Sequence, residues 1–127
     1  MFIDRLVLDL TVNSSGAATV YGTLPVTGRV LQLRYVPDGS TPLDTGADLT
    51  ITGETTGVAI ATLSNIGTSA FTTVPRQATH DVTGAALVYI AAGQPVTEPV
   101  YVAGERIKVV VAQGGTSKIG TLHIAVG

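Results

Sequence analysis

Apolar and polar side chains alternate along several stretches of this chain, and this alternation restricts the fold more than any other feature. In RLVLDLTV, at residues 5–12, leucine or valine stands at every even position. Successive side chains of a β-strand point to opposite faces, so the pattern predicts a strand with one buried face. The same alternation returns in RVLQLRYV at 29–36, ADLTIT at 47–52 and GTLHIAV at 120–126. Because no window carries the 3.6-residue apolar period of an amphipathic helix, we expect no helix longer than about two turns.

Three further apolar runs are continuous. They are GVAIATL at residues 57–63, AALVYIAA at 85–92 and RIKVVVA at 106–112. Such runs predict strands that are covered on both faces or that lie at a packed interface. The stretch YVAGERIKV, at 101–109, predicts a tight hairpin with Ala103 and Gly104 at its turn, because glycine tolerates the positive φ that such turns need.

Turn-forming glycines and prolines separate these runs about every 8–12 residues, a spacing typical of sandwiches and barrels. The sequence therefore predicts an all-β fold: a single antiparallel β-sandwich of about eight to nine strands with Greek-key or jelly-roll connections. With 127 residues the chain is long enough for one hydrophobic core but short for two. We expect residues 1–127 to form one domain.

The chain carries unusually little charge. Charged residues make up 13% of it, against about 25% in an average soluble domain, and the formal net charge is -2. Because charge repulsion between copies is weak, the composition favours a protein that is part of an assembly over a free monomer. The basic residues are scattered, so we expect no nucleic acid partner. The uncharged span at 55–75 is rich in threonine and serine and too polar for a bilayer, and the N-terminus lacks the features of a signal peptide; we expect no membrane partner.

The stretch VPRQATHDVTGAAL, at residues 74–87, is the best candidate for a reactive site, because it brings Arg76, His80 and Asp81 within six residues. In a strand, neighbouring side chains point to opposite faces, and an arginine repels a cation, so we predict no metal site here. The chain has no cysteine, and no serine lies in a Gly-x-Ser-x-Gly elbow. The second histidine, His123, is predicted to point outward from a strand. We therefore predict no catalytic residue, no cofactor and no enzyme activity.

Three segments follow one another in an order that carries a family resemblance. They are LSNIGTSAFTTVPRQATHDVTGAALVY at 63–89, EPVYVAGERIKVVVAQGG at 98–115 and GTLHIAV at 120–126. The succession of a Pro-Arg, a His-Asp-x-x-Gly and a Glu-Pro-x-x-Val-x-Gly resembles small β-sandwich proteins encoded among the head genes of tailed bacteriophages. The similarity covers roughly residues 16 to 126. Proteins of this family are capsid decoration, or cement, subunits.

The resemblance implies a structural virion protein that binds the outer surface of the phage head and stabilises contacts between capsomers. Its partner would be the major capsid protein, and it would be made in the host cytoplasm and located on the virion. We expect a homo-oligomer, with a trimer at the junction of three capsomers favoured over a dimer. The competing hypothesis is a tail or head-fibre module that binds a host glycan. Such a module would use exposed aromatics, whereas the tyrosines here fall mostly in apolar runs and are expected in the core.

In a cement subunit, Arg76, His80 and Asp81 are expected to lock a long loop or to lie at an interface. Arg76 would pair with Asp81 or with backbone carbonyls, and His80 would donate to the loop backbone. We also expect a compact subunit whose contacts are made by preformed faces rather than by long disordered arms.

Three further arginines are predicted to lie at the rim of the capsid contact. They are Arg5, Arg29 and Arg34, which stand at polar positions of alternating stretches. Exposed arginines that face an acidic surface contribute little individually, and their contribution is weakened by salt.

Overall fold

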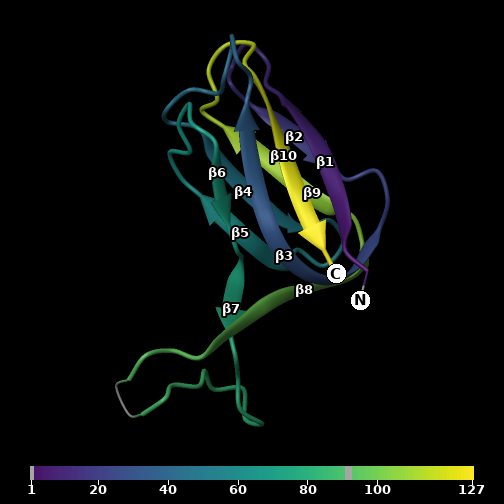
Figure 1. Cartoon of the computed structure of the whole chain (residues 1–127), viewed down its shortest axis with the longest axis vertical. Coiled ribbons are helices and arrows are strands. Elements are labelled where there is room, and N and C mark those ends of the chain that lie inside the picture. The colour runs from purple at the N-terminus through teal and green to yellow at the C-terminus, as the bar shows by residue number, and fades with distance from the viewer. Residues whose placement is uncertain (1, 91–92) are drawn as a thin grey trace.

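Two antiparallel β-sheets pack face to face in the computed structural model, which describes residues 2–90 and 93–127 (Figure 1). Within these residues the larger sheet has the strand order β1-β10-β3-β8-β7, with β6 paired beside β3, and the smaller has the order β2-β9-β4-β5. The larger sheet contains β1 (Asp4–Thr11), β3 (Val26–Pro37), β6 (Phe71–Thr73), β7 (Arg76–Ala78), β8 (Thr97–Glu105) and β10 (Ile119–Val126). The smaller sheet contains β2 (Ala18–Tyr21), β4 (Asp48–Gly53), β5 (Ala59–Leu63) and β9 (Ile107–Ala112).

The predicted fold class is confirmed: the chain forms an antiparallel all-β sandwich, and the described residues contain no helix. It follows that this part of the chain holds no helix able to cross a membrane. The described residues form ten strands rather than eight or nine, because β6 and β7 are separate elements of three residues each. Alternation cannot be recognised in such short stretches, and Pro75 lies between them.

The core lies between the two sheets and is built from the alternating apolar positions. The largest fully buried side chains are Tyr35, Leu10, Leu33, Leu43, Leu49, Ile51, Ile107, Leu122, Ile124, Val30, Val100 and Val109. Fully burying one such aliphatic side chain stabilises the fold by about 1.5–3 kcal/mol. The alternation in the sequence therefore supplies the inner face of each sheet.

The predicted hairpin at residues 101–109 is wrong. Its two halves, β8 and β9, belong to different sheets: β8 pairs with β3 and β7, whereas β9 pairs with β2 and β4. Gly104 does adopt a positive φ of 65°. The chain then crosses from one sheet to the other at Glu105 and Arg106 instead of folding back on β8.

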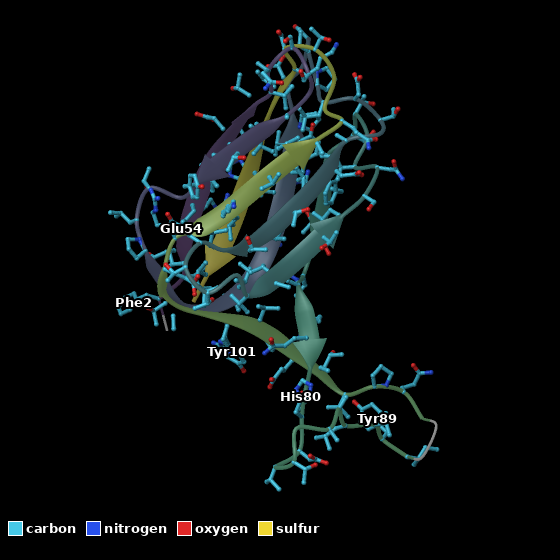
Figure 2. All side chains as sticks on the ribbon, turned by 180° about the vertical axis from the view of Figure 1, so that it is seen from behind. Phe2, Glu54, His80, Tyr89 and Tyr101 are labelled. Carbon is cyan, nitrogen blue, oxygen red and sulfur yellow. The ribbon has the colours of Figure 1, made fainter. Side chains whose placement is uncertain are left out.

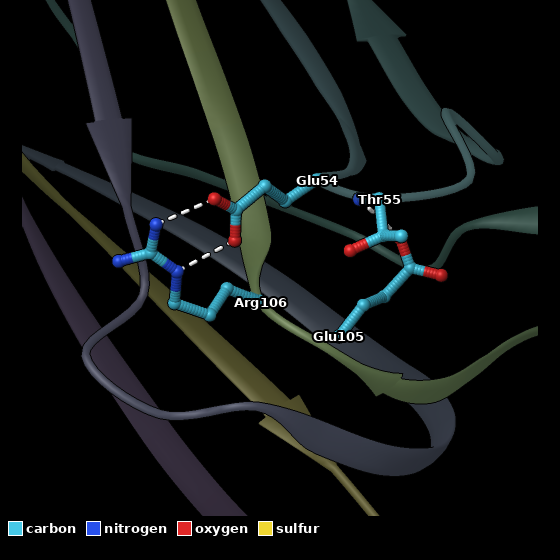
Figure 3. Close-up of polar contacts among 4 residues, drawn as sticks. All are labelled: Glu54, Thr55, Glu105 and Arg106. Carbon is cyan, nitrogen blue, oxygen red and sulfur yellow. Dashed lines mark hydrogen bonds and ion pairs between the residues drawn. The ribbon is translucent and has the colours of Figure 1, made fainter.

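Glu105 lies at this crossing and anchors it. Glu105 is 5% exposed, and its carboxylate accepts hydrogen bonds from the backbone N–H groups of Thr55 and Thr56, at 2.9 and 3.0 Å. The Thr56 hydroxyl donates a third bond, at 2.7 Å. Bonds from the Thr56 amide, its hydroxyl and the Thr55 amide hold the pKa of Glu105 below its ordinary value. This buried carboxylate thus ties the crossing to the turn that follows β4 (Figure 3).

The side chain of Arg106 points to the opposite side from Glu105 and holds the same crossing from the protein surface (Figure 3). Its guanidinium donates to both carboxylate oxygens of Glu54, at 2.6 and 2.5 Å. The guanidinium carbon also lies 4.8 Å from the centre of the Tyr21 ring, which places a cation over an aromatic face. The crossing is therefore held by a carboxylate inside and by an ion pair outside.

An arm leaves the sandwich where β7 pairs with β8 (Figures 1 and 2). We use this name for residues 76–99, of which 91 and 92 lie outside the described part. At its root Arg76 stands opposite Pro99, and Ala78 stands opposite Thr97. Farther out, backbone hydrogen bonds of 2.8–3.1 Å connect the stretches 79–81, 85–89 and 94–96. The expectation of a compact subunit is therefore wrong, because a hydrogen-bonded arm projects from the body.

Candidate interaction site

The outer part of the arm exposes large apolar side chains. Val82 is 104% exposed, Tyr89 74% and Ile90 71%, while Val88 and Leu87 are 45% and 36% exposed. Every residue from 81 to 90 is exposed. A strand buried on both faces would be covered by the rest of the chain, but the described part of the run AALVYIAA is exposed. Ala91 and Ala92, the last two residues of the run, lie outside the described residues. The other reading of this run, a packed interface, stays a prediction.

The arm is also free of charge over most of its length. Between Asp81 and Glu98 the sequence contains no Asp, Glu, Lys or Arg. Burying a charged group without a partner of opposite charge is costly. A surface that covers this arm must therefore be largely uncharged itself.

Asp81 organises the first turn of the arm. Its Oδ1 accepts bonds from the Thr83 backbone N–H at 2.8 Å, the Thr83 hydroxyl at 2.6 Å and the Ala85 backbone N–H at 3.1 Å. The Thr83 hydroxyl, followed by the Thr83 and Ala85 amides, holds the pKa of Asp81 below its ordinary value. The structure thus places Asp81 as a turn-forming residue whose partners are all local.

Arg76 and His80 lie in the same arm but use other partners. Arg76 donates to the Thr97 hydroxyl at 3.2 Å and to the Thr97 carbonyl at 2.9 Å. A backbone carbonyl was one of its two expected partners; Asp81, the other, is not bonded to it. The backbone of His80 forms a bridge with Ala86, its side chain is exposed, and the hydrogen bonds among the described residues include none from its imidazole. The three residues are close in sequence and do not form one site.

The structure brings Arg5, Arg29 and Arg34 to one surface, the outer face of the larger sheet. The inward positions of β1 and β3 are apolar, so these arginines point away from the core. Arg34 donates to the Thr72 hydroxyl at 2.8 Å, and Arg29 donates to the Gly127 carbonyl at 3.3 Å. Exposed valines, Val7 and Val36, lie on the same face. The outer face is thus mixed rather than strongly basic.

His123 lies on this face between Val7 of β1 and Arg34 of β3. It points outward, as the alternation with Leu122 and Ile124 predicts, and its side chain is half-buried. Its Nε2 lies 3.5 Å from the Thr121 hydroxyl, and its Nδ1 has no partner among the described residues. No group of three or more His, Asp or Glu in the described part is arranged to hold a metal ion.

The expectation that the tyrosines lie in the core holds for one of the four. Tyr35 is buried, and burial raises the pKa of its hydroxyl. Tyr21, Tyr89 and Tyr101 are 40%, 74% and 50% exposed, so the expectation of core packing is wrong for them. Figure 2 shows Tyr89 on the arm and Tyr101 where the arm joins the body. On the arm, the apolar neighbours of Tyr89 are exposed together with it. Along β8, Tyr101 points outward between the buried Val100 and Val102.

Besides the arm, the structure shows a surface that the sequence did not predict: the edge of the smaller sheet formed by β5. Among the described residues β5 pairs with β4 alone. Native sheet edges are usually protected by charge, by proline or by a covering segment. The free edge of β1 carries Asp4, Arg5 and Asp9, whereas no charged residue occurs from 55 to 75. That gap in charge was visible in the sequence, but only the sheet order shows that it marks an edge.

A shallow hollow adjoins this edge. It is lined by Thr62, Leu63, Ser64, Asn65, Ile66 and Phe71. The apolar members are half-buried and pack against the core. The carboxylate of Asp48, on β4, accepts a bond from the Asn65 backbone N–H at 3.0 Å. The edge of β5 and this hollow together form a strip of backbone and apolar side chain, which we call the β5 strip. Its own residues carry no charge, and the carboxylate of Asp48 lies at its end, on Asn65.

Comparisons with known proteins leave the function of these surfaces open. No protein-family model matches the chain, and no curated protein matches it at a significant level. Among solved structures, the crystal structure of FLHE matches it with 14% sequence identity and a TM-score of 0.42, over 98% of this chain and 95% of that one. A likeness this distant supports no argument about function.

Proposed function

We propose that this chain is a structural virion protein, a capsid decoration or cement subunit that binds the outer surface of a phage head and stabilises contacts between capsomers. The observation that carries the proposal is the arm: a projecting segment with exposed apolar side chains, no charge from 82 to 97 and few contacts with the rest of its own chain. The segments that carry the family resemblance include most of this arm.

A body with a projecting arm suits a protein that must touch more than one neighbour. The outer face of the larger sheet supplies one preformed surface, and the arm supplies another at a distance from it (Figure 1). Each contact can be modest, because many copies act together on a shell and binding to the assembled state stabilises it by mass action. None of this requires a reactive group, so we propose no enzyme activity and no cofactor.

The partners of the proposed subunit are the major capsid protein and other copies of this chain. A threefold cluster fits the junction of three capsomers, so we propose a trimer, with a dimer as the alternative. Arg5, Arg29 and Arg34 would contact acidic capsid groups from the outer face of the larger sheet. The proposed location is the outer surface of the head, after synthesis in the host cytoplasm.

The proposal is tested by adding purified protein to expanded shells that lack it. We expect saturable binding at micromolar concentration or below and a higher temperature of shell rupture, measured by cryo-EM occupancy and by light scattering during heating. Protein that stays monomeric, does not rebind at about 10 μM and leaves the rupture temperature unchanged would show that this is not a cement subunit.

A second candidate function is a tail or head-fibre module that binds a host glycan. The exposed rings of Tyr89 and Tyr101 favour it, since sugars stack on exposed aromatic faces. A glycan array with the wild type and with Tyr89→Ala and Tyr101→Ala separates the two functions. Binding of a defined glycan that either change abolishes, with the protein located at fibre tips, would favour the module over the cement subunit.

A further inference from the structure

We infer that the arm of one copy docks on the β5 strip of a second copy, and that this head-to-tail contact builds the oligomer. The inference deepens the proposed function, because it assigns the surface through which copies meet. It does not require a capsid, so it can be tested apart from shell binding.

The arm needs a partner because its apolar side chains have no core of their own. Val82, Leu87, Val88, Tyr89 and Ile90 together expose on the order of 500 Å² of side-chain surface, taking about 150–250 Å² for a large side chain. The largest apolar patch on a typical monomer covers about 300–600 Å² and is often functional. A standard interface buries about 800 Å² on each partner, so this arm can supply more than half of one.

The β5 strip needs a partner for a complementary reason. The outward N–H and C=O groups of an edge strand can accept another strand, and here no charge or proline prevents it from residue 59 to 65. The register with β4 skips Ile60, so the start of β5 is bent. Residues 61–63 remain as the straight part of the strip, because β5 ends at Leu63 and Asn65 turns away with a positive φ of 52°. Leu63, Ile66 and Phe71 offer apolar surface beside this part.

The two surfaces match each other in chemistry. Each combines available backbone groups with apolar side chains, and each is free of charge over more than ten residues. An extended segment that adds to a sheet edge gains main-chain hydrogen bonds and places alternate side chains on one face. The free edge of β1 is less suitable as the acceptor, because it would bring Asp4, Arg5 and Asp9 against uncharged arm residues. The other edge of the smaller sheet, β2, is itself uncharged, but it ends at Tyr21, where the guanidinium of Arg106 lies over the ring and pairs with Glu54.

The match cannot be made within one chain. In Figures 1 and 2 the arm points away from the sandwich, and Figure 2 shows Tyr89 on the arm, farther from the body than Tyr101. The pairing of β7 with β8 fixes this direction at the root. The arm and the β5 strip must therefore meet between copies. A contact between two different surfaces closes into a ring when the rotation between copies allows it. Three copies in such a ring would give the proposed trimer.

Disulfide trapping tests the contact directly, because the chain contains no cysteine. The double variant Tyr89→Cys with Thr62→Cys places one thiol on the arm and one on β5. We expect it to form reducible covalent dimers and larger species in mild oxidant at about 100 μM without any capsid. The matched control, Tyr89→Cys with Thr19→Cys, moves the second thiol to β2, the opposite edge of the same sheet. Equal cross-linking of both variants, or none with Thr62→Cys, would overturn the inference.

Charge variants test the same contact in solution. We expect Ile90→Asp on the arm and Thr62→Lys on β5 each to raise the dissociation constant at least tenfold in sedimentation velocity, because each buries an unpaired charge. The controls Tyr101→Asp and Thr19→Lys place the same charges on the body and on β2 and should leave it within twofold. Circular dichroism and thermal melting verify that each variant is folded.

A mixing experiment distinguishes head-to-tail contact from contact between two arms. Ile90→Asp keeps an intact β5 strip, and Thr62→Lys keeps an intact arm, so a mixture of the two should form a one-to-one dimer and nothing larger. If Thr62→Lys associates like the wild type while Ile90→Asp does not, the arm docks elsewhere and the inference is wrong. Shell binding, measured separately, decides the proposed function: cross-linked oligomers that do not bind shells would refute the cement role and leave this contact standing.

Discussion

At the scale of single residues, Glu105 anchors the point where the chain crosses from one sheet to the other. It is a buried carboxylate in a protein with few charges, and three hydrogen bonds from Thr55 and Thr56 compensate for its burial. Its neighbour Arg106 pairs with Glu54 on the surface. These contacts replace the hairpin that Ala103 and Gly104 suggest. A sequence pattern cannot reveal them, because the partners lie about 50 residues away.

The first residue-scale prediction concerns acid stability. Because the native pKa of Glu105 lies below its ordinary value, its stabilising contribution is full above the unfolded pKa of about 4.3. It is lost as pH falls through the lower native pKa. We expect Glu105→Gln to have a lower melting temperature than the wild type above pH 5, with the difference shrinking towards pH 3. Melts across this range, with Asp9→Asn as an exposed control, test this; a difference independent of pH would contradict it.

The second residue-scale prediction concerns Gly53, at the end of β4. A Cβ built there would overlap the carboxylate of Glu105 and lie 3.0 Å from Val58. Since that carboxylate is held by three hydrogen bonds, it cannot move aside without losing them. We expect Gly53→Ala to cost about 1–3 kcal/mol in the free energy of unfolding, as overpacking generally does. Gly39→Ala, where nothing lies within 4 Å, serves as the control in denaturant titrations and should leave stability nearly unchanged.

At the scale of elements, the sequence predicts the strands better than their partners. Alternation in residues 5–12 and 120–126 identifies β1 and β10 and their inward faces, because one buried face forces a period of two. It does not reveal which sheet β9 joins, since a strand of either sheet has the same pattern. The run at 85–90 shows a further limit: apolar composition alone cannot distinguish a strand that is covered by its own chain from an exposed arm.

The arm gives an element-scale prediction about proteolysis. Its residues 81–90 are exposed and its side chains have no core, so local opening costs less free energy there than in the sandwich. We expect chymotrypsin to cleave the free protein first after Leu87 or Tyr89, before any cut after the buried Tyr35, as identified by mass spectrometry. The associated form should be protected at these bonds. A first cut within β3 or β10 would contradict this assignment of local stability.

At the scale of the whole molecule, the two exposed surfaces should respond differently to salt. In the proposed capsid contact, Arg5 and Arg34 face acidic groups from the outer face of the larger sheet, and exposed ion pairs weaken as salt screens them. The arm contact is uncharged. We expect Arg5→Glu combined with Arg34→Glu to lower shell occupancy most at about 50 mM salt and least at about 500 mM, with little change in melting temperature.

Self-association through the arm should change less than twofold over the same salt range, measured by sedimentation. If self-association instead disappears at high salt, charged groups dominate it and the arm does not. Neither surface could be located from the sequence alone, because Arg5 and Arg34 come together only through the pairing of β1, β10 and β3.

The root of the arm also has a mechanical consequence. Three residue pairs, from Arg76 opposite Pro99 to Ala78 opposite Thr97, hold the two strands of the arm together at its root, beside a body that is two sheets thick. A pull along the arm is carried by two covalent chains into β8 and, through Pro75, into β6, and both of these strands pair with β3. A sideways push meets only the thickness of a two-stranded ribbon, which bends far more readily than a sandwich. We therefore expect the arm to be stiff along its length and compliant when flexed, so that a shell held by the proposed contacts of many such arms could change its curvature while those contacts persist.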